Sequence, residues 1–149
     1  MIVNRQRQVR ARVKELERFL ARVRHTLRLG RREVTVALVS DAEIARLNRA
    51  FRGKDKATDV LSFPANAKER SRTARHALRN GTGSSYLGDV AIAPRVARRN
   101  ARRFGRSVPD ELRILILHGV LHLLGYDHES DNGEMNRLEQ RLRGRLGIG

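Results

Sequence analysis

The chain reads Leu112-Arg-Ile-Leu-Ile-Leu-His118-Gly-Val-Leu-His122-Leu-Leu-Gly125-Tyr-Asp-His128 close to its C-terminal end. Apolar side chains fill almost every position before the last glycine, and a helix that is apolar nearly all round is a buried helix. Gly125 can end this helix, because glycine adopts the left-handed conformation that a residue with a Cβ resists. The stretch therefore predicts a buried helix that stops shortly before the third histidine.

The three histidines of this stretch follow one another at offsets of four and six residues. Four residues turn a helix by about 400°, so His118 and His122 lie one above the other on the same face. The chain past Gly125 has room to fold back and bring His128 to the same point. One buried histidine is usually a satisfied core residue. Three that converge instead form the first shell of a catalytic metal site, with a fourth position left for water.

Strand and helix signals alternate along the rest of the chain. We expect a strand over 1–4, a helix from Val9 to Leu27 ended by Gly30, and a strand over Glu33–Val39. A second helix runs from the Ser40–Glu43 capping box to Gly53, with Ile44, Leu47 and Phe51 on one face, and is followed by strands over Thr58–Phe63 and Tyr86–Ala93. The last three elements are a helix from Pro94 to Arg103, the histidine helix from Ser107, and a helix carrying Met135, Leu138, Leu142 and Leu146. This order predicts an α+β fold. One small mixed β-sheet of about four strands has helices packed on it, and the metal-site helix lies near the C-terminus. At 149 residues we expect one domain over 1–149.

The composition is strongly basic. Lysine and arginine together number 32 against 16 acidic residues, which gives a net charge of +16, and nearly all of the excess is arginine. Such a charge attracts polyanions, and arginine pairs with phosphate through two parallel donors, so contact with nucleic acid is favoured over a merely solvated surface. Residues 65–85 read as a mobile basic loop. The aromatic residues are sparse, so no stacking platform for single strands is evident.

Cysteine is absent from the chain, which excludes disulfides and thiolate metal sites. No apolar run has the length of a signal peptide or of a membrane span. We therefore expect a cytoplasmic protein with no membrane contact.

A metal ion held by three imidazoles can lower the pKa of bound water to about 7, which supplies a nucleophile for attack on carbonyl carbon or phosphorus. Metallopeptidases with the pattern His-Glu-x-x-His carry their general base where this chain has Gly119, although the histidine offsets match the longer metzincin pattern. A phosphodiester substrate agrees better with the charge. Possible bases are the metal-bound hydroxide itself, Asp127 and Glu129, and Asp127 is also a typical turn residue.

Three blocks of the sequence resemble the YbeY-type endoribonucleases, the bacterial rRNA maturation factor family. They are the histidine stretch His118–His128, the block Phe51-Arg-Gly-Lys-Asp-Lys-Ala-Thr-Asp-Val-Leu-Ser-Phe-Pro64, and Leu87-Gly-Asp-Val-Ala-Ile92. The blocks occur in the family's order and span about half of the chain. The resemblance implies a zinc-dependent, single-strand-specific endoribonuclease that acts in 16S rRNA 3′-end maturation and ribosome quality control.

The resemblance also implies a set of functional residues. His118, His122 and His128 would hold one Zn²⁺ per chain. Arg52 would lie in the active-site cleft, where it would bind phosphate or stabilise transition-state charge beside metal-bound water or hydroxide. Lys54 and Lys56 are further candidates for holding the RNA backbone, although they also suit a solvated approach to the next strand.

The implied partners are rRNA and the small ribosomal subunit. A non-enzymatic ribosome-associated RNA-binding or assembly protein with a structural metal is the alternative that the charge supports equally well, and a metallopeptidase is a weaker one. The sequence leaves open the nucleophile (metal-bound water or the RNA 2′-hydroxyl), the cleavage-site preference and the oligomeric state.

Overall fold

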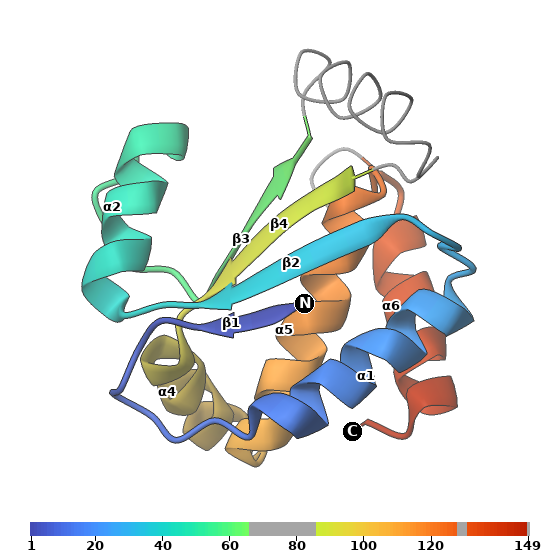
Figure 1. The fold of residues 1–149 in the computed structure, drawn as a ribbon, viewed down its shortest axis with the longest axis horizontal. Coiled ribbons are helices and arrows are strands. Elements are labelled where there is room, and N and C mark those ends of the chain that lie inside the picture. Colours follow the sequence, from blue (N-terminus) through green and yellow to red (C-terminus); the bar gives the residue numbers. More distant parts are fainter. Residues whose placement is uncertain (66–85, 128–130, 149) are drawn as a thin grey trace.

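The computed structural model describes residues 1–65, 86–127 and 131–148 (Figure 1). Its elements are β1 (Ile2–Asn4), α1 (Val13–Thr26), β2 (Glu33–Leu38), α2 (Asp41–Arg52), β3 (Val60–Pro64), β4 (Tyr86–Ile92), α4 (Pro94–Phe104), α5 (Val108–Leu123) and α6 (Glu134–Leu146). The predicted order of strands and helices is confirmed. The basic loop predicted over 65–85 lies outside the described residues from residue 66 onward. Of the helices that the structure describes, none is long and apolar enough to cross a membrane.

The four strands form one sheet in the order β1-β2-β4-β3. β1 pairs with β2 and β2 pairs with β4 in parallel, whereas β3 pairs with β4 antiparallel. The prediction of an α+β fold with a small mixed sheet is therefore confirmed. β3 stands at one edge of the sheet, which leaves one side of this strand without a strand neighbour.

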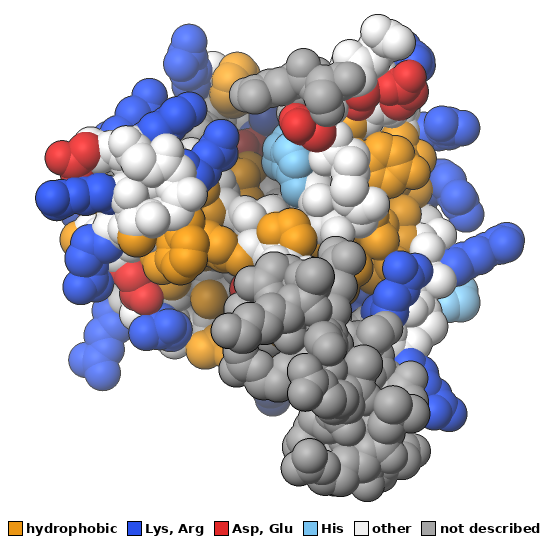
Figure 2. Space-filling view, turned by 90° about the horizontal axis from the view of Figure 1, so that it is seen from above, with side chains coloured by type: hydrophobic (Ala, Val, Ile, Leu, Met, Phe, Trp, Pro, Cys, Tyr) orange, Lys and Arg blue, Asp and Glu red, His pale blue; other side chains and the backbone are white. Residues whose placement is uncertain are grey.

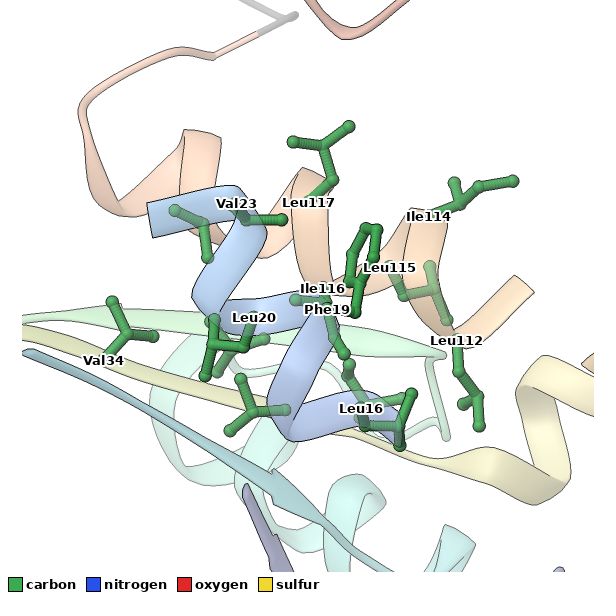
Figure 3. Packing of buried hydrophobic residues seen from close by; sticks show 14 of the residues in the cluster. Leu16, Phe19, Leu20, Val23, Val34, Leu112, Ile114, Leu115, Ile116 and Leu117 are labelled. Carbon is green, nitrogen blue, oxygen red and sulfur yellow. The ribbon is translucent and has the colours of Figure 1, made fainter. Parts of the chain in front are cut away.

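Helices cover both faces of the sheet, because successive side chains of a strand point to opposite faces. The larger core lies on the face of Val36, Val90 and Ile92, where α1 and α5 pack on the sheet and α6 packs on α5. Figure 3 shows side chains of α1 lying against those of α5 in this core, among them Leu16, Phe19, Leu20, Val23, Leu112, Leu115 and Ile116. A smaller cluster lies on the other face, made by Val39, Ile44, Leu61, Ala91, Ala93 and Val96. Burying each large aliphatic side chain stabilises the fold by about 1.5–3 kcal/mol.

The predicted bounds of the first helix are wrong at both ends. Val9 is buried, as its place in the apolar stripe predicted, but the helix begins only at Val13. The side chain of Gln6 donates to the Val9 carbonyl and accepts from the Val9 N–H, both at 2.9 Å, and so holds this segment in a turn. At the other end α1 finishes at Thr26, and Arg28 already has a φ of 54°, before Gly30 is reached.

The apolar face predicted for the second helix is only partly buried. Ile44 is completely buried and Leu47 packs against the smaller core, but Phe51 is 67% exposed. The residues of α2 after Asn48 are exposed, and the ring of Phe51 contacts the ring of Phe63 in the edge strand. Phe51 therefore forms the exposed end of the face that the sequence predicted.

Candidate active site

The ends of α5 are fixed by the residues that the sequence predicted. The Ser107 hydroxyl accepts a hydrogen bond of 3.2 Å from the Asp110 N–H and caps the first turn. At the other end Gly125 has a φ of 100°, and its N–H donates to the His122 carbonyl at 3.0 Å. The helix therefore places His118 and His122 in its last two turns.

The two histidine rings meet on one face of α5. Their Nε2 atoms lie 3.0 Å apart, and the ring centroids are 4.6 Å apart at an interplanar angle of 69°. Both side chains are partly exposed. Figure 2 shows histidine surface beside a hollow, with Lys and Arg side chains along its other side. The pair is thus open to a ligand from solvent.

Glu139 of α6 is a site residue that the sequence analysis missed. Its carboxylate Oε1 lies 3.0 Å from His118 Nδ1, and the residue is only 7% exposed. Because an ionised carboxylate can only accept a hydrogen bond, His118 donates its Nδ1–H to Glu139, and the neutral ring then has its lone pair on Nε2, which faces His122. Glu139 follows Met135 by four residues and precedes Leu142 by three, so an acid within the apolar stripe of α6 was the available signal.

The donor pair fits a small divalent cation. Two nitrogens bound tetrahedrally at about 2.0–2.1 Å from zinc would be about 3.3 Å apart, close to the 3.0 Å observed between the Nε2 atoms. A carboxylate behind a ligating histidine is the usual partner that fixes its tautomer. The third predicted ligand, His128, lies outside the described residues, and within 1–65, 86–127 and 131–148 no three candidate ligands meet. The complete ligand set thus stays a prediction.

The close packing around Gly119 explains why this chain has no glutamate next to His118. A Cβ at this position would lie 2.5 Å from Val90 Cγ1, inside the contact between α5 and β4. The Gly119 carbonyl accepts a 3.1 Å hydrogen bond from the Ser62 hydroxyl, which ties α5 to β3. No glutamate side chain fits here, so the general base of the His-Glu-x-x-His peptidases has no counterpart at this position.

A pair of glycine substitutions tests this packing. Gly119→Ala is expected to destabilise the fold by about 1–3 kcal/mol, because the new methyl overpacks the Val90 contact. Gly144→Ala in α6 is the matched control, since nothing lies within 4 Å of its added Cβ, and it should stabilise by about 0.5–1 kcal/mol through helix propensity. Urea unfolding measures both, and equal shifts of the two variants would contradict the close approach at Gly119.

Glu139→Gln is expected to weaken zinc binding by about tenfold or more. The amide keeps the volume and an acceptor oxygen but loses the charge that makes the His118 ring a better ligand. Competition with a chromophoric chelator measures the affinity, and Glu15→Gln, at a surface ion pair with Arg12, is the control. If affinity fell only in step with the stability of the metal-free protein, Glu139 would have a packing role alone.

Arg52 is the last residue of α2, and Gly53 closes the helix with a φ of 68°. Its side chain is exposed, and no hydrogen bond or ion pair of the described residues joins it to His118 or His122. The C-terminal ends of α2 and α5 both lie on the upper side of Figure 1. The described part of the chain therefore places Arg52 toward the same end of the molecule as the histidine pair, but not in contact with it.

The remaining predicted candidates have different positions. Lys54 and Lys56 are exposed, in a segment that Asn48 ties to α2 by donating to the Lys56 carbonyl at 2.9 Å. Asp127 is partly buried just past the end of α5, and Glu129 lies outside the described residues. These positions leave the choice of general base open.

Comparison with known proteins agrees with this architecture. The family model described as "Endoribonuclease YbeY" matches residues 1–147. "Endoribonuclease YbeY" of Solibacter usitatus is 46% identical over 133 residues, which cover 89% of this chain and 78% of the relative. That of Koribacter versatilis is 47% identical over 131 residues, covering 88% and 75%. The solution structure of TM1509 from Thermotoga maritima superposes with a TM-score of 0.60 at 30% identity, covering 98% of this chain and 89% of that one. The chain therefore belongs to the YbeY endoribonuclease family.

Proposed function

We propose that this chain is a zinc-dependent endoribonuclease that cleaves single-stranded RNA in the cytoplasm, where it acts on rRNA of the small ribosomal subunit in 16S 3′-end maturation and ribosome quality control. The observation that carries the proposal is the pair of Nε2 atoms 3.0 Å apart on α5, with Glu139 behind one of the rings. The net charge of +16 supports a polyanionic substrate.

Each residue of the site has a chemical task in this proposal. His118, His122 and His128 would hold the zinc ion, which when bound acts as a Lewis acid on a phosphoryl oxygen. Glu139 keeps the proton of His118 on Nδ1 and thereby directs the lone pair of Nε2 toward the metal position. Arg52 binds the phosphate through its planar guanidinium and stabilises the charge that develops on it. Asp127 and Glu129 are the side chains proposed as candidates for the general base, which accepts the proton of the nucleophile.

A second function, non-enzymatic RNA binding on the ribosome, is favoured by the surface of α4. This helix carries Arg95, Arg98, Arg99, Arg102 and Arg103 and no acidic residue. Among the described residues only Arg95 of this set has an ion pair, at 3.7 Å from Asp41. Such a basic helix can bind phosphates without any chemistry, so it is compatible with both functions.

A cleavage assay separates the two. Zinc-loaded protein is incubated with RNA containing the 3′ end of precursor 16S rRNA, either single-stranded or annealed to a complementary strand. The nuclease proposal expects cleavage of the single strand, protection of the duplex, and loss of cleavage after chelation that added zinc restores. Tight binding with no cleavage of either RNA by fully zinc-loaded protein would favour the assembly function.

A further inference from the structure

Phe51 is a large apolar side chain left open to solvent at the end of α2. It is 67% exposed, and its ring lies 5.0 Å from the ring of Phe63 at an interplanar angle of 68°. Leaving a phenylalanine exposed forgoes about 1.5–3 kcal/mol of burial energy. The edge-to-face contact with half-buried Phe63 orients the Phe51 ring while most of its surface remains accessible. The arrangement suits a ligand with a flat apolar face.

The segment that carries Phe51 is rich in basic residues. Arg46, Arg49, Arg52, Lys54 and Lys56 lie in one segment of eleven residues with Asp55 as its single acid. All five basic side chains are exposed, and none of them has an ion pair with a described carboxylate. A flat apolar ring in a segment of exposed cations suits a nucleotide, whose base stacks while a neighbouring phosphate pairs with arginine or lysine.

The aromatic pair is connected to the histidine site through the edge strand. Phe63 follows Ser62 on β3, and the Ser62 hydroxyl donates to the carbonyl of Gly119, the neighbour of His118, at 3.1 Å. β3 is at the edge of the sheet, between α2 on one face and α5 on the other. An RNA strand that crosses this edge can therefore meet both the ring of Phe51 and the site on α5.

We infer that Phe51, held by Phe63, is a stacking site for one unpaired base of the RNA strand, and that it contributes to selecting single strands. The inference rests on the proposed endoribonuclease function and adds a residue to it. A base in a duplex is already stacked on its neighbours, so only an unpaired base can use the ring. The sparse aromatic residues gave no sign of such a platform in the sequence because its two rings meet only in the fold.

The absence of tryptophan from the chain allows a direct test. Phe51→Trp introduces a single fluorophore, and stacking of a base on its indole quenches the emission. Stopped-flow mixing with oligouridylate records the quenching before cleavage begins. The matched control is Ala21→Trp, at an exposed position of α1 that has no part in the proposed RNA contacts. The stacking site predicts quenching of Phe51→Trp by oligouridylate, and little by an abasic strand of equal charge or by duplex RNA.

A kinetic measurement provides a second test. Phe51→Ala is expected to raise KM for single-stranded RNA by about 5- to 150-fold with a much smaller change in kcat, because one stacked base contributes about 1–3 kcal/mol to binding. Phe51→Tyr should retain most of the wild-type KM. Equal quenching of the Phe51→Trp and Ala21→Trp variants, or quenching by the abasic strand, would overturn the stacking site.

The two proposals fail in different ways. If wild-type protein failed to cleave RNA while Phe51→Trp was still quenched, the nuclease function would be contradicted and the stacking site kept. If Phe51→Ala cleaved single strands with an unchanged KM and Phe51→Trp was not quenched, the stacking site alone would be overturned.

Discussion

Replacing His118 with alanine is expected to lower the rate of single-strand cleavage by more than about a thousandfold. Removal of one preorganised group that stabilises transition-state charge costs about 10²–10³ in rate, and loss of the metal removes more than one such group. The side chain is partly exposed and lies at the surface end of α5 beside His122 and Glu139, so the fold should persist. Cleavage rate, zinc content and urea unfolding are the measurements.

His25→Ala is the matched control for this experiment. His25 is an exposed histidine of α1, so its replacement removes the same group from the surface without touching the proposed ligands. It should leave both zinc content and cleavage unchanged. Cleavage by the His118→Ala variant at the wild-type rate would show that the activity does not come from this site.

Replacing Arg52 with alanine is expected to reduce kcat/KM by about 10²–10³-fold while the zinc content stays at the wild-type level. The reason is that in the proposed site the guanidinium would contact the phosphate and not the metal ligands, in keeping with the exposed position of Arg52 at the end of α2. Arg52→Lys should recover only part of the activity, because an ammonium cannot donate two parallel hydrogen bonds to a phosphate.

A second variant controls for the loss of one positive charge that accompanies Arg52→Ala. Arg18→Ala in α1 removes one exposed arginine and so changes long-range attraction of RNA by the same single charge. It should cost little at moderate salt concentration. If Arg18→Ala and Arg52→Ala reduced kcat/KM equally, Arg52 would contribute only to the overall field of the protein.

The order of strands and helices could be predicted because local signals agree with the tertiary structure. Ser40 and Ser107 accept hydrogen bonds from the N–H groups three residues on, and Gly53 closes α2 in the left-handed conformation. The start of α1 was misplaced because an apolar stripe records which residues are buried, not their backbone conformation. Val9 is buried, but the side chain of Gln6 bonds both of its backbone groups and keeps it out of the helix.

The sequence could predict only those contacts of the candidate site that join residues close together in the chain. His118 and His122 are neighbours through helix geometry alone, and their contact is confirmed. Glu139 reaches His118 only through the packing of α5 on α6, and Phe51 reaches Phe63 only through the fold of α2 beside β3, so neither contact follows from spacing along the chain. The role of His128 stays a prediction that rests on the histidine spacing and the family resemblance, and the role of Arg52 stays one that rests on the resemblance alone.

A crystallographic anomalous-difference map recorded at the zinc absorption edge tests the central claim most directly. The account predicts one zinc ion about 2.0–2.1 Å from a ring nitrogen of each of His118, His122 and His128, with no protein atom in the fourth position. An ion enclosed by four protein ligands, or rings of the three histidines that point to different places, would contradict it.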